Sequence, residues 1–495
     1  MGHAYFLGID VGTSGVKALL MSDDGSVAAT ATTPLTLQTP QPGWAEQDPA
    51  AWWRATLASI TDVRARCPAA NVVAVGISGQ MHSSVFLDRA GDVIRPALLW
   101  CDGRTTAECA EITERVGGEA RLRDLACNPA LEGFTLPKVL WLRKHEPESY
   151  ARLATVMLPK DYIRYRLTGV LATDPSDASA TLMYDTAKLR WSDEILKAVD
   201  VPLAIVPAVG GSSEVLGHIT AEAASVTSLE EGTPVVGGGA DNACGAAGVG
   251  AVAAGDVVSS WGTSGTVLAP MHAPLVDPLL RAHTFCHVAP GVWYMMGVVL
   301  SAGGAFNWYR EQFARDLDDR SAAKQLDDEA NSVPAGAGGV TFLPYLQGER
   351  TPHRDASVRG ALVGLSLAHT RAHATRAVLE GITFALRDSL TILQERGLSP
   401  NHLLLTGGGA KSTFLRTLQA DVFGLPVTTV NREEGPAYGA ALLAAVGVGV
   451  YPDLEAATVA TLAREPMQQP NEELRSAYDE AYARYRRSYP AARPA

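Results

Sequence analysis

The tetrapeptide Gly-Thr-Ser-Gly occurs twice in this chain of 495 residues, at positions 12–15 and 262–265, each time between two apolar runs. Such a pattern predicts a β-hairpin with a tight turn. Because glycine permits unusual backbone angles, this turn can direct N–H groups and hydroxyls at an anion. A repeat about half a chain apart favours two related domains. Two hairpins that face each other across a cleft would hold a polyphosphate, although either copy alone can be an ordinary hairpin.

The composition limits the class of protein. The length is too great for one hydrophobic core and fits two domains. A net charge of −12 argues against a nucleic-acid partner. No apolar run approaches the roughly 18–20 residues that span a bilayer, and no export signal is visible, so we expect no membrane partner. The six cysteines include no Cys-x-x-Cys pair, which disfavours a zinc site and fits a reducing cytoplasm.

The first half of the chain predicts a mixed α/β sheet. Residues 5–37 are expected to form successive antiparallel strands, followed by a helix from Pro49 to about Arg66 that Asp48 caps. Residues 72–78 form a continuous apolar strand of the kind buried on both faces. Strands that first pair antiparallel and then alternate with helices give such a sheet. Further helices are expected at 128–145 and 155–170, and a polar loop at 174–179 that either covers a substrate or only turns.

Two strand ends carry candidate binding residues. Met81 and His82 follow strand 72–78 at its carboxyl end, where open α/β sheets place ligands. His82 can hydrogen-bond a hydroxylated ligand and Met81 can pack on its carbon face, but a packed methionine and a satisfied loop histidine are the common alternative. After Trp100, Asp102 and Arg104 either bind sugar hydroxyls or pair with each other.

Asp241 and Asn242 follow three glycines, at the predicted start of a helix of very small residues. Capping the helix is the ordinary task of such residues. Three glycines exceed that need, because they let a ligand approach the backbone closely. Asp241 is therefore our candidate catalytic acid or base. The small residues of the helix suggest tight packing at a domain junction.

The second half contains a helix over 370–396, a buried strand over 402–406 and a turn of three glycines at 407–409. Such a turn leaves a flat surface for a planar base and ribose, unless it is only a tight connection. Residues 471–489 predict a helix whose tyrosines form a packing face.

The motifs of this chain resemble the FGGY carbohydrate kinases from Tyr5 to about Val446. Glycerol kinases usually have Gln-Arg-Glu at residues 80–82, so Gln-Met-His there resembles the xylulose-phosphorylating branch. The matching pieces lie at 8–14, 44–49, 79–82, 158–162, 238–242, 262–265, 343–346, 348–352 and 407–410.

The resemblance implies two ribonuclease-H-like (actin-like ATPase) domains with mixed sheets around a central cleft. We expect a sugar- and phosphate-binding domain at 1–250, a nucleotide-binding domain at 251–450 and a peripheral helical segment at 451–495. The implied reaction is phosphorylation of a sugar hydroxyl by ATP with Mg²⁺, in the cytoplasm. A homodimer is one option for its assembly.

The resemblance also assigns residues. Asp241 corresponds to the base, and Asp10 to the acid that faces Mg²⁺ through water. The substrate-binding set is Gln80, Met81, His82, Trp100, Asp102 and Asn242. The nucleotide- and phosphate-binding set is Gly12, Thr13, Ser14, Lys17, Gly262, Thr263, Ser264, Gly303, Asn307, Gly408, Gly409 and Thr413. Thr413 departs from the family, since several relatives have Asn there.

Two alternatives stay open at this point. The first is a kinase for another ketose or a polyol, such as ribulose or glycerol. The second is a chaperone-type ATPase on the same fold, which the short segment after the second core disfavours because it has no room for a peptide-binding domain. For the kinase, an aspartate with the ordinary pKa of about 3.9 is a weak base, so we expect Asp241 to orient the hydroxyl and take its proton late.

Overall fold

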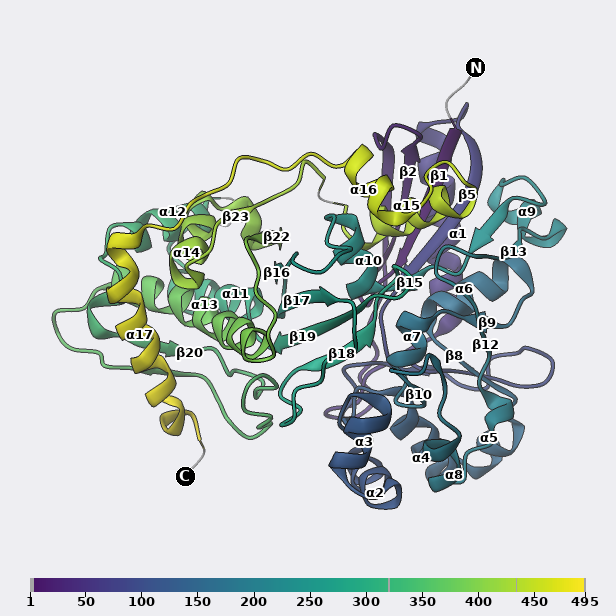
Figure 1. Ribbon diagram of the computed structural model, residues 1–495, viewed down its shortest axis with the longest axis horizontal. Coiled ribbons are helices and arrows are strands. Elements are labelled where there is room, and N and C mark those ends of the chain that lie inside the picture. Colours follow the sequence, from purple (N-terminus) through teal and green to yellow (C-terminus); the bar gives the residue numbers. More distant parts are fainter. Residues whose placement is uncertain (1–3, 319–320, 433, 494–495) are drawn as a thin grey trace.

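The computed structural model describes residues 4–318, 321–432 and 434–493. Two large sheets organise the chain: the first stands at the upper right of Figure 1 and the second at its centre, with helices to the left. We call the body around each sheet the first and the second lobe. The fold is mixed α/β, as expected. Within the described ranges, no helix has the length and apolar character needed to cross a bilayer.

The first sheet has seven strands in the order β13-β14-β5-β1-β2-β3, with β15 beside the end of β5. β1 pairs antiparallel with β2 and parallel with β5, and this register places Asp10 beside both Lys17 and Ser78. The strands are β1 (Ala4–Val11), β2 (Gly15–Ser22), β3 (Val27–Pro34), β5 (Asn71–Gly79), β13 (Val215–His218), β14 (Pro234–Val236) and β15 (Gly239–Ala240).

The second sheet repeats this arrangement in the order β18-β19-β17-β16-β22-β23. Its central strand β16 again pairs antiparallel with the next strand, β17, and parallel with a later one, β22. The two Gly-Thr-Ser-Gly turns therefore follow equivalent strands, β1 and β16. The strands are β16 (Val258–Trp261), β17 (Gly265–Met271), β18 (His283–Cys286), β19 (Trp293–Val299), β22 (Leu403–Gly407) and β23 (Val427–Thr428).

Helices cover both sheets. Asp48 accepts from the Ala50 N–H and caps α1, which ends at Arg66 as predicted. Around the first sheet lie α1 (Pro49–Arg66), α6 (Pro159–Thr168), α9 (Ala221–Thr227) and α10 (Asp241–Gly248). Around the second lie α11 (Gly303–Phe313), α12 (Ala322–Asn331), α13 (Arg371–Glu395) and α14 (Thr413–Phe423), with the small pair β20 (Thr341–Leu343) and β21 (Ala361–Val363).

A helical extension with short strands lies below the first sheet in Figure 1. It contains the helices α2 (Thr106–Val116), α3 (Glu119–Ala126), α4 (Thr135–His145), α5 (Pro147–Arg152), α7 (Pro175–Ser179) and α8 (Asp193–Ala198). Its paired short strands are β4 (Glu46–Gln47) with β7 (Ala97–Leu98), β6 (Val85–Leu87) with β8 (Thr155–Met157), β9 (Ala172–Thr173) with β12 (Ala208–Val209), and β10 (Tyr184–Asp185) with β11 (Arg190–Trp191).

Three local predictions in this extension were wrong. The helix expected over 128–145 begins only at Thr135, because Pro129 and Gly133 interrupt the pattern before it. Residues 155–157 are strand rather than helix, since they pair with β6. The polar segment 174–179 is the short buried helix α7, whose first N–H groups are capped by Asp174.

The helix α15 (Pro436–Gly447) returns from the second half of the chain to the first sheet. A Cβ at Gly8 would lie 2.0 Å from the Ala437 carbonyl oxygen, and one at Gly76 would lie 1.9 Å from that of Ala440. α15 also packs against α10, in agreement with the tight packing that the small residues of α10 suggested. The division expected at residue 450 therefore does not follow the packing of the helices.

The segment after residue 450 joins both lobes (Figure 1). α16 (Leu454–Thr461) lies beside α15, whereas α17 (Arg475–Arg487) packs on α13 and α14. Tyr478, Tyr482 and Tyr485 are buried in the core of the second lobe, so the predicted packing face is confirmed. The segment is part of two cores, in contrast to the peripheral position that we expected.

Candidate active site

A cavity of about 210 Å³ lies between the lobes. Both Gly-Thr-Ser-Gly hairpins reach it, the first through Thr13 and the second through Ser264, as the repeated tetrapeptide predicted. Its walls also contain the predicted catalytic and sugar-binding residues of strand β5 and helix α10. The lining residues are Thr13, Met81, His82, Trp100, Asp241, Asn242, Ser264, Thr266, Met296, Val298 and Arg350.

Asp241 is the first residue of α10, and its side chain does not cap the helix, because Ala240 occupies the capping position. The carboxylate oxygen Oδ1 instead accepts from the backbone N–H of Asn242 at 2.8 Å and from its side-chain amide at 3.1 Å. These bonds hold the carboxylate at the cavity wall. Asn242 also lines the cavity, so its role in the sugar site stays a prediction.

Two carboxylates shape the electrostatics of the cavity. Burial and, after it, the negative charge of Asp10 together raise the pKa of Asp241 to about 7, although the two bonds from Asn242 lower it. Burial also raises the pKa of Asp10 to about 6, although the Ser78 hydroxyl and the Lys17 ammonium lower it. Asp241 is therefore a stronger base than the ordinary aspartate that we expected from the sequence, and its pKa suits proton transfer near neutral pH.

Asp10 suits a cation. Its Oδ1 atom is buried and has no hydrogen-bond partner within the described part of the chain. In those same residues, no three His, Cys, Asp or Glu side chains form a metal-binding group. Mg²⁺ is usually held by one or two carboxylates, several waters and substrate phosphates, so a single acid facing the ion through water fits this chemistry.

His82 is a neutral hydrogen-bonding group. Burial lowers the pKa of its imidazole to about 3. Its Nδ1 lies 2.6 Å from the Ala180 carbonyl oxygen, which can only accept, so the ring proton is on Nδ1. Nε2 is then an acceptor for a sugar hydroxyl. The ring also packs against Phe134 at a centroid distance of 4.6 Å, which fixes its orientation.

Gln80 does not line the cavity, unlike its neighbours Met81 and His82. The Thr13 hydroxyl and the Ser83 hydroxyl both donate to its Oε1 at 3.1 Å. The indole N–H of Trp100 in turn donates to the Thr13 hydroxyl at 2.9 Å. Gln80 thus positions the first hairpin, which differs from the sugar contact that we expected of it. Trp100 both lines the cavity and holds the hairpin.

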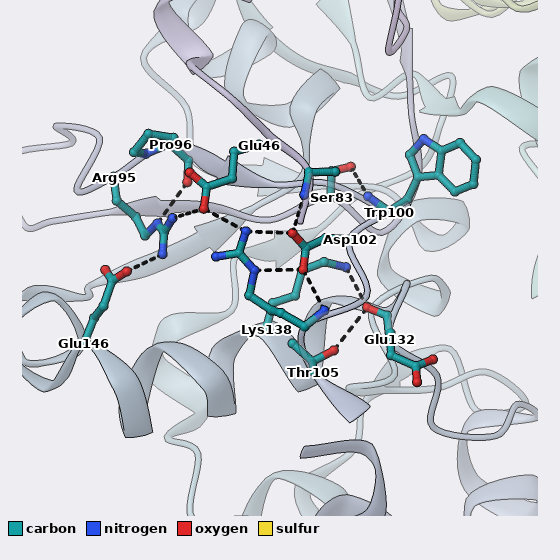
Figure 2. Close-up of polar contacts among 12 residues, drawn as sticks. Glu46, Ser83, Arg95, Pro96, Trp100, Asp102, Thr105, Glu132, Lys138 and Glu146 are labelled. Atoms are coloured by element: carbon teal, nitrogen blue, oxygen red, sulfur yellow. Dashed lines mark hydrogen bonds and ion pairs between the residues drawn. The ribbon is translucent and has the colours of Figure 1, made fainter. Parts of the chain in front are cut away.

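Asp102 is also outside the cavity, which corrects its expected role in sugar binding. Its carboxylate accepts from Arg104 Nε at 2.8 Å and Nη2 at 2.7 Å, and from the Ala45 N–H at 2.6 Å. Figure 2 shows this carboxylate among its polar partners, with Trp100 directed away from them. Because Arg104 is only two residues away and both side chains are buried, the pairing that the sequence left open occupies both oxygens.

Comparison with known proteins identifies the family. The family model described as the FGGY family of carbohydrate kinases, N-terminal domain, matches residues 5–248, and the C-terminal domain of the same family matches residues 257–448. The chain belongs to the FGGY family of carbohydrate kinases. It is a sugar kinase, and its actin-like fold with two sheet-containing domains is confirmed.

Several relatives of this kinase resemble it over nearly their whole length. The xylulose kinase of Bacillus subtilis is 41% identical over 91% of this chain and 90% of its own. The xylulose kinase of Escherichia coli strain K12 is 39% identical over 98% of both chains. Among solved structures, a "xyloylose kinase" from Brucella ovis is 39% identical and superposes with a TM-score of 0.91 over 98% of this chain and 99% of its own.

Three of the predicted nucleotide residues of the kinase, Gly303, Gly408 and Gly409, lie near Trp261, at the end of β16. The Gly303 N–H donates to the Gly262 carbonyl at 2.8 Å, and a Cβ at Gly303 would lie 2.6 Å from that oxygen. A Cβ at Gly409 would lie 2.6 Å from the Trp261 ring. Packing alone therefore explains these two glycines. Gly408 is exposed, and the nearest atom to a Cβ built there would be the Trp261 carbonyl oxygen, at 4.0 Å. Gly408 is therefore the glycine of this turn that leaves space for a ligand.

Other predicted nucleotide residues are exposed around the two hairpins and the helix starts that follow them. Their roles stay predictions. Lys17 bonds the Glu434 carbonyl at 3.3 Å, which links the first hairpin to the segment before α15. The exposed members are Ser14, Gly262, Thr263, Asn307, Gly408 and Thr413.

Beyond the second hairpin, we predicted no role for the cavity residues of the second lobe. These are Thr266, Met296, Val298 and Arg350. Arg350 was within a matching motif, Gly-Glu-Arg-Thr-Pro at 348–352, which signals a function without stating it. Thr266, Met296 and Val298 can be assigned to the cavity side of the sheet by strand alternation, but only once the pairing of β17 with β19 is known.

Proposed function

We propose that this kinase transfers the γ-phosphoryl group of ATP to D-xylulose and forms D-xylulose 5-phosphate, with Asp241 as the base. The observation that carries the proposal is the placement of Asp241, with its raised pKa, in a cavity that both phosphate-type hairpins reach. The names of the relatives support D-xylulose as the sugar.

Phosphoryl transfer requires alignment of the reactants and neutralisation of charge more than covalent help from the protein. In our proposal the hydroxyls and N–H groups of the two hairpins orient the triphosphate, with Thr13 and Ser264 nearest to the sugar. Asp241 orients the attacking hydroxyl and accepts its proton. His82 accepts a hydrogen bond from another hydroxyl through Nε2, while Met81 packs on the carbon chain.

Asp10 would hold Mg²⁺ through water in this arrangement. The ion would supply charge neutralisation at the phosphates. Asp10 itself would contribute a second negative charge close to Asp241, which keeps the Asp241 carboxylate basic. Lys17, beside Asp10 in the register of β1 and β2, would limit that effect.

The sugar hydroxyl must also react in preference to water. We therefore propose that the lobes close when the sugar binds, as in other enzymes that use substrate binding to assemble their site. Small-angle scattering should show a smaller radius of gyration with D-xylulose and a non-hydrolysable ATP analogue than with either ligand alone. An unchanged profile would count against closure.

An assay of ADP release tests the substrate. D-xylulose, D-ribulose, glycerol and xylitol are compared at a fixed concentration of MgATP. We expect the highest kcat/KM with D-xylulose, and one sugar phosphate formed for each ADP. A higher kcat/KM with another ketose or a polyol would replace D-xylulose by that compound. ADP release without sugar phosphate would contradict the kinase reaction itself.

Two finer aspects belong to the proposal. A cytoplasmic location is supported by the six cysteines, all of which are free thiols in the described chain. A homodimer is supported by large apolar side chains on the surface of the second lobe, among which Leu365 and Leu367 are exposed. Light scattering after gel filtration tests the second point directly.

A further inference from the structure

Arg350 brings a guanidinium from the second lobe to the wall of the sugar cavity. Its position is fixed by the next residue, because the Thr351 N–H donates to the Val298 carbonyl at 3.1 Å and the Val298 N–H donates to the Thr351 hydroxyl at 3.0 Å. Val298 itself lines the cavity at the end of β19. Arg350 thus lies on a loop that Thr351 holds against the end of β19.

The guanidinium has donors without acceptors. Among the described residues it makes no hydrogen bond and no ion pair shorter than 4 Å, although five N–H groups are available. Its near neighbour across the lobes is the backbone of Gly133, where a Cβ would lie 3.9 Å from Nη2. The side chain is half-buried at the cavity wall, so these donors are free to bind an acceptor of the ligand.

The charges around Arg350 favour a neutral acceptor. Two carboxylates, Glu132 and Glu349, lie close enough to oppose the effect of burial, which lowers the pKa of Arg350. Because these two carboxylates already balance the positive charge of the guanidinium, a negatively charged ligand group is not required to neutralise it. The positive charge also acts on His82, which places Arg350 near the histidine of the cavity, whereas the charge that acts most on Asp241 is that of Asp10.

The chemistry of a pentulose supplies such an acceptor. When a 2-ketopentose closes to a furanose, O5 bonds to C2 and is no longer a free hydroxyl. Phosphorylation at O5 therefore requires the open chain, in which C2 carries a carbonyl. That oxygen can only accept hydrogen bonds, and a guanidinium can only donate them.

We propose that Arg350 is a specificity-determining residue that donates to the C2 carbonyl oxygen of the open-chain ketose, while Asp241 takes the hydroxyl at the other end of the sugar. This inference rests on the proposed function. It adds a reason why a ketose is preferred to the corresponding polyol, and it assigns part of the sugar site to the second lobe. Closure of the lobes would then complete the recognition of the sugar.

The experiment compares Arg350→Met and Arg350→Lys with the unmodified kinase on D-xylulose and on xylitol, which has a hydroxyl in place of the C2 carbonyl. Losing a charge-assisted hydrogen bond should lower kcat/KM for D-xylulose about ten- to a hundredfold, and that for xylitol by much less. Arg350→Lys should recover part of the ketose preference. Arg354→Met is the matched control, because Arg354 lies on the same loop and pairs with Glu119 outside the cavity.

An equal loss on both substrates, or a ketose preference unchanged in Arg350→Met, would overturn the inference. So would a higher kcat/KM of the unmodified kinase for D-xylonate than for D-xylulose, since the guanidinium would then serve a carboxylate. If Arg350→Met does not fold, as judged by thermal melting, the ratio is measured with Arg350→Lys. Failure of the unmodified kinase to phosphorylate D-xylulose at all would instead contradict the proposed function.

Discussion

The Ser176 hydroxyl accepts the backbone N–H of Ala240 at 2.9 Å, directly before Asp241. The same hydroxyl donates to Asp174 Oδ2 at 2.6 Å, and Asp174 lies 3.0 Å from the buried ammonium of Lys160. All of these side chains are buried. A chain of polar contacts thus connects the interior of the first lobe to the residue that we assign as the base.

Ser176→Ala should shift the position of Asp241 without changing how the sugar binds. The Ala240 N–H loses its acceptor, which costs about 1–3 kcal/mol for a buried donor. We expect a lower melting temperature and a lower kcat, with KM for the sugar nearly unchanged. Ser225→Ala, at an exposed position of α9, is the control. A lower melting temperature with normal kcat would show that Ser176 has only a structural role.

Asp241→Asn should abolish turnover while the sugar still binds. The amide keeps the shape of the carboxylate but cannot accept the hydroxyl proton, and removing a general base typically costs about 10²–10⁴-fold in rate. Single-turnover kinetics give the chemical step, and calorimetry gives the affinity for D-xylulose. Near-normal turnover would remove Asp241 from the role of base.

The stability of the kinase should depend on pH through Asp241. Its pKa is about 7 in the folded protein and about 3.8 in an unfolded chain, so the folded state retains a proton that the unfolded state has lost. The free energy of unfolding therefore falls as pH rises from about 4 to about 7. Asp241→Asn removes this effect, so its gain in melting temperature over the unmodified kinase should grow between pH 5 and pH 8. Asp62→Asn, on an exposed face of α1, should show no such trend.

Gly408 and Gly409 should respond differently to alanine. At Gly409 the new methyl group would meet the Trp261 ring at 2.6 Å, and overpacking of this kind costs about 1–3 kcal/mol. At Gly408 the methyl group has space, so stability should be kept while KM for ATP rises if the nucleotide lies on this turn. Melting curves and ATP titrations of both variants provide the test. An unchanged KM in Gly408→Ala would place the nucleotide elsewhere.

Asp102→Asn should act on stability rather than on the sugar. Breaking a buried ion pair by changing one partner costs about 3–5 kcal/mol, and Glu46, whose carboxylate lies 2.8 Å from Arg104 Nη2, would offset part of this loss. We expect a marked loss in the urea midpoint, with KM for D-xylulose close to that of the unmodified kinase. A large rise in KM at normal stability would restore Asp102 to the sugar site.

The sequence predicted the features that depend on residues adjacent to one another in the chain. The hairpin turns follow from four consecutive residues, and the helix that starts at Asp241 follows from the glycines before it. The role of Gln80 could not be predicted, because its partner Thr13 is 67 residues away. Arg350 enters the cavity only through the pairing of Thr351 with β19, which no local pattern indicates.

The path of the chain after the second sheet also could not be predicted from the sequence. No local pattern indicated that Ala437 and Ala440, from the second half of the chain, would pack on Gly8 and Gly76 of the first sheet. Asp102 shows the opposite case. The sequence left open both sugar binding and pairing with Arg104, and only the three-dimensional structure distinguished between these two roles.

The return of α15 to β1 and β5 affects the order in which this protein can mature on the ribosome. The first strands to be synthesised keep one face bare until residue 447 has left the exit tunnel, since α15 supplies the cover over Gly8 and Gly76. The core of the first sheet can therefore be completed only after nearly the whole chain has been translated.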